Sequence, residues 1–222
     1  TDSTSLYKFK VDAVSFVYAG NGTLTASHPF KTFYMDSRTD MLYLASELNP
    51  VWGNSPARIM GVSFNVVNAS PLIMNGLTIK IQNTTLTSLT GFMNSEWVTV
   101  YSGNFTMPGS GWVYFPFTPF VWNGTSNLII EVCYNNNTVN TNSSVMATNN
   151  PGLTWHQYLD LPTGNGCTDL MAGSLQANRP NLAFALNAIT DIKQNGNQIP
   201  ERFSLKQNYP NPFNPVTKIS FD

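Results

Sequence analysis

Hydrophobic and polar residues alternate along several short stretches of the chain. The clearest alternation covers residues 60–66, 77–81 and 97–101, and a longer one covers residues 6–18 and ends near the Gly20-Asn21-Gly22 turn. A period of two places the apolar side chains on one face of an extended strand and the polar side chains on the other. We therefore expect a half-buried β-strand at each of these four stretches.

Two apolar runs within residues 111–134, joined by Asn123-Gly124, are expected to form the centre of the fold. The Asn-Gly dipeptide readily adopts the positive φ angles of a tight hairpin turn. Glycines and prolines interrupt the region too often for a helix. Residues 128–134 are apolar on both faces apart from Glu131, which is typical of a strand buried on both sides. We expect a hairpin in the middle of a β-sandwich.

Residues 41–48 fit two different elements. Four apolar residues within them have the spacing of one helix face, but residues 41–44 also have the pattern of a buried strand. Because an eight-residue helix is marginal by itself, we expect a strand followed by one helical turn at residues 45–49.

Taken together, the pattern predicts an all-β protein. Asn75-Gly76 provides a turn before the strand at residues 77–81, and further short strands are expected at residues 30–35, 145–148, 153–159 and 182–186. About ten short strands separated by turn signals predict a jelly-roll-like β-sandwich over residues 1–187.

The sequence changes character after the sandwich. Residues 188–200 contain few large apolar side chains, as a linker does. In residues 201–222, the side chains of Thr217, Ile219 and Phe221 alternate with Lys218 and Ser220, which predicts a tail strand.

Charged residues make up only 10% of the chain, against about 25% in ordinary soluble domains. The net charge is −1, and the surface chemistry is supplied instead by 27 Asn and 42 Ser plus Thr residues, as is common in extracellular β-proteins. No cluster of Lys and Arg is available for nucleic acid, and no run reaches the ~18 apolar residues of a membrane helix. We expect a protein that neither binds nucleic acid nor spans a membrane, and residues 1–5 fit a mature N-terminus after export.

Few residues offer catalytic chemistry. His28 and His156 are the only histidines, and neither belongs to a cluster with metal-ligand spacing or to a recognisable nucleophile motif. We interpret both as hydrogen-bonding surface residues, with a catalytic histidine as the alternative. Glu131 is either an acid with a raised pKa or, as we favour, a carboxylate paired with Arg or backbone donors. We predict a non-enzymatic protein without a metal or another cofactor.

Two sets of residues suggest contact with carbohydrate. Trp52, Trp155 and Tyr158 lie in or beside polar loops, where they either stack on sugar rings or fill the ends of the sandwich core. N-x-[ST] sequons, which mark possible glycosylation, begin at Asn21, Asn68, Asn83, Asn104, Asn123, Asn136 and Asn142.

The C-terminal segment is the most specific feature. Phe203-Ser204-Leu205, the run from Gln207 to Pro215 (QNYPNPFNP) and Thr217-Lys218-Ile219 resemble the start of the type A sorting domain of type IX secretion cargo. In that family the segment leads into further strands of a small sandwich that directs export and surface attachment. The resemblance implies a secreted protein, extracellular or on the cell surface, whose tail holds the first strand of such a domain.

A weaker resemblance covers the preceding part. Residues 37–48, 76–80, 100–103, 120–128 and 178–181 are similar to a β-sandwich module of large secreted proteins from the same bacteria, for which no catalytic activity is assigned. In an exported protein two cysteines suggest a disulfide, and the resemblance places it between Cys133 and Cys167; two unpaired thiols are the alternative. Asp2-Ser3-Thr4 suits the O-glycosylation motif of these bacteria, which makes Ser3 a further candidate for glycosylation.

The tail provides the leading functional hypothesis. A lone strand gains nothing in water and must add to the edge of a sheet. Addition to a neighbouring copy would build a filament or coat by head-to-tail contacts, and thus a homopolymer. Its anchors would be Tyr209, Phe213, Ile219 and Phe221. The alternative hypothesis is an adhesive or carbohydrate-binding module with a glycan as partner.

Overall fold

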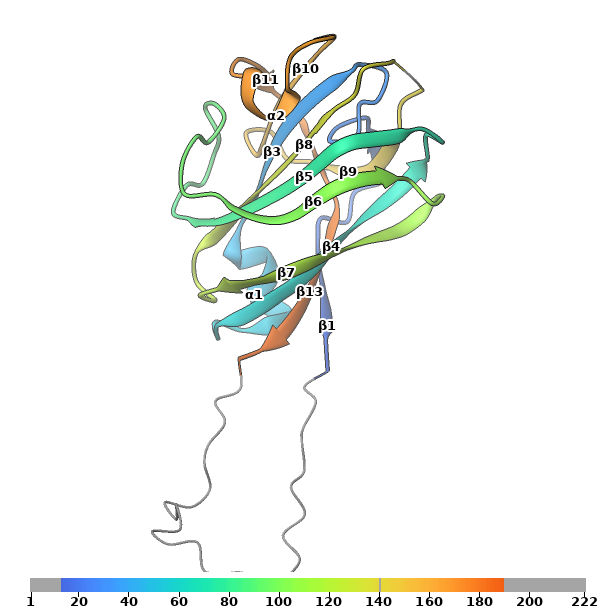
Figure 1. The fold of residues 1–222 in the computed structure, drawn as a ribbon. Helices are drawn as coiled ribbons and strands as arrows, with labels where there is room; N and C mark the ends of the chain where they lie inside the picture. Colours follow the sequence, from blue (N-terminus) through green and yellow to red (C-terminus); the bar gives the residue numbers. More distant parts are fainter. Residues whose placement is uncertain (1–12, 140, 190–222) are drawn as a thin grey trace, which may run out of the picture. The chain divides into compact units, whose positions relative to one another are not determined.

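The computed structural model describes residues 13–139 and 141–189, which form two antiparallel β-sheets packed face to face (Figure 1). The all-β sandwich is thereby confirmed. The described residues form thirteen strands rather than about ten, together with two short helices.

The first sheet is built around β4 (Ala57–Asn68), which has β13 (Leu182–Ala188) on one side and β7 (Gly111–Trp122) on the other. Strand β1 (Ser15–Ala19) pairs with the far side of β13. The remaining members gather at the end of β4: β9 (Ser144–Asn149), β2 (Leu24–Ala26) and β12 (Asn178–Pro180).

The second sheet has six strands. At its centre β8 (Asn127–Asn135) lies between β3 (Asp36–Tyr43) and β5 (Ile73–Thr84). Outside β5 lies β6 (Val98–Thr106), and outside β3 lie β10 (Thr154–Leu159) and β11 (Ser174–Leu175). From β6 to β10 each successive strand crosses to the opposite sheet, as in jelly-roll-like folds.

The core lies between the two sheets and is rich in aromatic side chains. Phe30 packs against Phe64 and Phe115 at ring-centroid distances of 5.0 and 5.9 Å, and all three rings are fully buried. Burying such a ring contributes about 2–3 kcal/mol through removal of apolar surface from water.

The predicted hairpin at residues 111–134 is wrong in its pairing. Strand β7 belongs to the first sheet and β8 to the second, so Asn123-Gly124 connects the two layers. The predicted tight turn does not form either, because the connection spans residues 123–126 and only Gly124 of the dipeptide has a positive φ, +83°. The chain bends instead around the Asn123 side chain, which accepts the backbone N–H groups of Thr125 and Ser126. Strand β8 is buried along almost its whole length, as predicted.

Other predicted boundaries also shift. Residues 31–35 form turns rather than a strand, and β3 begins at Asp36, five residues before the predicted strand. Helix α1 (Ala45–Trp52) extends beyond the predicted turn at 45–49, because the Glu47 carboxylate accepts the N–H of Leu44 and anchors the first turn. Asn75-Gly76 lies inside β5 at a register shift.

At the N-terminal end, β1 begins at Ser15, and residues 6–12 of the predicted strand lie outside the described part of the chain. The predicted strands at 60–66, 77–81, 145–148, 153–159 and 182–186 are confirmed, and the one at 97–101 is confirmed from Val98. Strands β2, β11 and β12 and helix α2 (Gly166–Asp169) are too short to give a recognisable sequence pattern. Of the predicted linker and tail, only Ala188, which ends β13, and Ile189 belong to the described residues.

Candidate functional site: a braced sheet with an open edge

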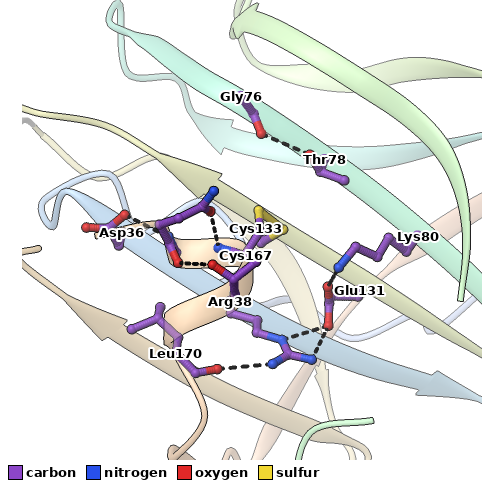
Figure 2. The surroundings of a disulfide bond; sticks show 12 residues. Asp36, Arg38, Gly76, Thr78, Lys80, Glu131, Cys133, Cys167 and Leu170 are labelled. Atoms are coloured by element: carbon purple, nitrogen blue, oxygen red, sulfur yellow. Dashed lines mark hydrogen bonds and ion pairs between the residues drawn. A yellow bond between two sulfur atoms is a disulfide. The ribbon is translucent and has the colours of Figure 1, made fainter. Parts of the chain in front are cut away.

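The predicted disulfide is confirmed and lies on the outer face of the second sheet. Cys133 on β8 is bonded to Cys167 in α2, with their Cα atoms 5.1 Å apart (Figure 2). The Asp36 carboxylate accepts the N–H groups of Leu161 and Gly166, both at 3.0 Å, and burial raises the pKa of this carboxyl. The bond and the carboxylate together fasten the segment around α2 onto β3 and β8.

A buried ionic cluster lies beside the disulfide. Both oxygens of Glu131 are paired: one with the Arg38 guanidinium at 2.7 Å and the other with Lys80 Nζ at 2.6 Å (Figure 2). The interpretation of Glu131 as a paired carboxylate is therefore confirmed. Because a cationic side chain is bound to each of its two oxygens, we interpret the Glu131 carboxylate as part of a structural ion-pair network.

Arg38 also secures the loops that cover this face. Its guanidinium donates to the carbonyl oxygens of Leu170 at 3.1 Å and Met93 at 2.7 Å, and it lies 4.3 Å from the ring centre of Phe92. The neighbouring Asp40 accepts the N–H of Met93 at 2.8 Å. Burial, together with the charge of Glu131, raises the pKa of Asp40 well above its ordinary value.

Both histidines are buried, which corrects the interpretation of them as surface residues. Their rings lie 5.3 Å apart; His28 Nε2 donates to the Asn178 carbonyl oxygen, and His156 Nδ1 lies 2.8 Å from Thr39 Oγ1. Burial lowers the pKa of His28 to about 4 and that of His156 to about 3. The pair is therefore neutral at physiological pH.

The three aromatic residues proposed for glycan stacking all make contacts within the fold. The indole N–H groups of Trp52 and Trp155 donate to the carbonyl oxygens of Ser55 and Ala172. Lys31 Nζ lies 3.4 Å from the centre of the Tyr158 ring, so a cation occupies one face of that ring. Because Trp155 and Tyr158 are three residues apart on β10, they point to opposite faces of the sheet, and the three rings do not form one platform.

The sequons differ in accessibility. Asn136 is only 5% exposed, and its Oδ1 accepts the N–H of Asn75 at 2.8 Å, so a sugar there would require local opening. Asn83 is half-buried, whereas five sequon residues are exposed: Asn21, Asn68, Asn104, Asn123 and Asn142. Ser3 and the tail residues Tyr209, Phe213, Ile219 and Phe221 lie outside the described residues.

The edge strands differ in length and in how they are protected. Strand β1, one edge of the first sheet, has neither charge nor proline but is only five residues long. Strand β7, at the edge of the first sheet, contains Pro116 and Pro119, which have no N–H to offer to another strand. Strand β6, nine residues long, contains neither proline nor a charged residue, and among the described strands it pairs only with β5. Proteins usually block such an edge with charge, proline or a covering segment. We take β6 as the candidate functional site.

Comparisons of the chain with protein-family models, with curated proteins and with solved structures found no match. Neither of the described helices has the length and hydrophobicity needed to cross a membrane. In the described ranges, no group of three or more His, Cys, Asp and Glu side chains is placed to hold a metal ion.

Proposed function

We propose that this chain is a secreted or cell-surface structural protein that assembles into an extracellular filament or coat by strand addition. The observation that carries this proposal is the long, uncharged and proline-free edge of β6. The tail strand around residues 217–221 of one copy would pair with β6 of the next. Because the donor and acceptor surfaces differ, the contact is head-to-tail and propagates.

The tail has the composition that strand addition requires. Thr217, Ile219 and Phe221 are β-branched or aromatic and alternate with polar residues. The preceding prolines restrict the backbone, which lowers the entropy lost when the segment binds. Tyr209 and Phe213, placed between these prolines, would act as anchors.

An extracellular location is supported by the disulfide and by the low charge. Disulfides persist in oxidising compartments and are rare in the cytosol. In this one, Cys133 is fully buried on β8. The tail, through its resemblance to a sorting domain, would also direct export. The proposal is for a non-catalytic protein, since the buried ionic cluster and the histidine pair both stabilise packing.

The experiment compares lysine substitutions on the two edges. Thr99→Lys/Ser102→Lys places two charges on exposed positions of β6, and Thr118→Lys/Val121→Lys places two on exposed positions of β7 as the matched control. By light scattering and electron microscopy of the native protein, the wild type and the β7 variant should form large particles. The β6 variant should be monomeric with an unchanged circular dichroism spectrum.

A substitution in the tail tests the other half of the contact. Burying Phe221 should contribute about 2 kcal/mol, so Phe221→Asp should give a folded monomer. If the variant keeps its particle size but loses thermal stability, the tail packs on its own domain and the proposal is wrong. Particles that survive both the β6 and the Phe221 changes would also overturn it.

A further inference from the structure

The outer face of the first sheet carries four half-exposed aromatic rings. Phe16 and Tyr18 on β1 are 48% and 57% exposed, and Trp112 and Tyr114 on β7 are 44% and 42% exposed. We call these four residues the aromatic face. Between them lie small residues: the register places Ala183 and Ser63 between Tyr18 and Tyr114, and Ala185 and Gly61 between Phe16 and Pro116. The rings of β1 and β7 therefore extend over these small residues of β13 and β4 and contact each other above them.

The rings of the aromatic face are held in place before any ligand arrives. Tyr18 and Trp112 form an edge-to-face pair at 5.2 Å, and Phe16 and Tyr114 form another at 6.2 Å. The Tyr114 hydroxyl donates to the Met60 carbonyl oxygen at 3.1 Å. Such fixed rings offer contact area at low entropic cost, because few rotamers are lost on binding.

A polar hollow adjoins the aromatic face at Tyr18. Its volume is about 400 Å³, and it is lined by Tyr18, Gly20, Asn21, Glu47, Thr148 and Asn150. Both oxygens of the Glu47 carboxylate are bound by the Arg179 guanidinium, so the carboxylate charge is compensated. The Thr148 hydroxyl donates to Asn181 Oδ1 and accepts the N–H of Gly22, so it is engaged within the fold. The hollow thus offers the side-chain amides of Asn21 and Asn150 beside an aromatic ring.

The chemistry of this surface favours a neutral partner with both apolar and hydroxyl-bearing surfaces. The strands β1, β13, β4 and β7 contain a single charged residue, Arg58. An anionic membrane surface would require several Lys and Arg residues. A ring of a second copy placed against the hollow would remove water from the amides of Asn21 and Asn150 without giving them a hydrogen bond. A sugar ring satisfies both parts, since its C–H groups can lie on an aromatic ring while its hydroxyls bond to amides.

We propose that the aromatic face and the adjoining hollow bind a neutral polysaccharide. One sugar stacks on the Tyr18–Trp112 pair, and the next enters the hollow and bonds to Asn21 and Asn150. This site is separate from the β6 edge, because it lies on the face of the other sheet. It also differs from the three aromatics that the sequence suggests, which are engaged inside the fold.

The test is affinity electrophoresis of the 222-residue chain in gels containing hydroxyethylcellulose, laminarin or galactomannan, with anionic alginate as the charged comparison. All binding tests are made in the Thr99→Lys/Ser102→Lys variant, which is expected to be monomeric, and its particle size is measured separately. Failure of assembly and failure of sugar binding therefore remain distinguishable. We expect retardation by at least one neutral polysaccharide and none by alginate.

Substitutions then locate the site. Trp112→Ala and Tyr18→Ala should each weaken retardation about threefold or more, as expected for loss of one stacked ring. Phe33→Ala removes an aromatic ring of similar exposure elsewhere and should leave retardation unchanged. Asn21→Ala alters an exposed side chain outside the ring packing, so its effect reports on binding even if the ring variants lose stability.

Three results would overturn the proposal. The first is the absence of retardation in every neutral gel, and the second is retardation that Trp112→Ala, Tyr18→Ala and Asn21→Ala all preserve. The third is a dimer that Trp112→Ala dissociates while no polysaccharide retards the chain, which would make this face a contact between copies.

Discussion

Charged and polar side chains inside β3 stabilise this fold at positions that their residue types alone do not mark as buried. Asp36, Arg38 and Asp40 recur every second residue and so share one face of the strand. That periodicity is present in the sequence, but charged residues are normally exposed, so the apolar pattern predicts the strand only from Met41. The partners that make burial tolerable, Glu131 and the Met93 carbonyl, come from distant segments whose register the sequence does not reveal.

The burial of the two histidines is likewise not evident from residue type alone, and it leads to a prediction about the pH dependence of stability. In the unfolded chain a histidine gains its proton near pH 6.5, whereas His28 and His156 in the fold stay neutral until the pH falls to about 4 and about 3. Because the histidine pKa values are lower in the folded chain than in the unfolded chain, the unfolded chain binds more protons below pH 6.5. The free energy of unfolding is therefore at its full value above pH 6.5 and decreases as the pH falls. By pH 4 each histidine should cost roughly 3 kcal/mol of unfolding free energy.

Urea unfolding of the wild type and of His28→Gln/His156→Gln between pH 7 and pH 4 measures this effect. The loss of stability with falling pH should be markedly smaller in the double variant, whatever its stability at pH 7. The raised pKa of Asp40 makes the free energy of unfolding increase as the pH falls, which is opposite to the effect of the histidines. Because Asp40 is present in both proteins, it does not alter the comparison. Parallel profiles for the two proteins would contradict the prediction.

Among whole elements, those with strong alternation were predictable and those fixed by tertiary partners were not. The pattern at residues 60–66 lies inside β4, the strand that the first sheet is built around. In contrast, Asn123-Gly124 correctly marks a change of chain direction but neither the turn type nor the pairing, because local turn chemistry does not say whether the following strand returns to the same sheet. The open edge at β6 likewise depends on which strands remain unpaired, and that is known only from the complete topology.

Gly61 tests the fit between two neighbouring strands. A Cβ atom there would lie 2.5 Å from the Phe115 carbonyl oxygen and from the Tyr114 side chain, where β4 passes β7. Gly61→Ala should therefore lower the unfolding free energy by about 2 kcal/mol through overpacking. Gly91→Ala is the matched control, because no atom lies within 4 Å of its added Cβ. Chemical denaturation showing equal stability for the two variants would mean that the strands adjust freely.

At the scale of the whole molecule, the β6 edge and the aromatic face share one property, a scarcity of charged residues. The net charge is −1, and neither β6 nor the strands β1 and β7 that carry the aromatic face contain a charged residue. Ordinary domains keep apart in solution partly through like charge, and their sheet edges are blocked by lysine or proline. A neutral edge and a neutral aromatic face therefore suit the two partners that we propose, a β-strand with a single charge in one case and a neutral polysaccharide in the other.

This neutrality leads to a prediction about salt. If the tail strand, with Lys218 as its one charge, adds to β6, assembly rests on backbone hydrogen bonds and apolar contacts. Light scattering of the wild type should then change little as NaCl rises from about 0.05 M to about 1 M, although the Debye length shortens from more than 10 Å to about 3 Å. The Thr99→Lys/Ser102→Lys variant should recover part of its assembly at high salt, because screening weakens repulsion between the new lysines and Lys218. Wild-type particles that dissolve as salt rises would instead identify ion pairs as the cohesive contacts, and strand addition at β6 would be wrong.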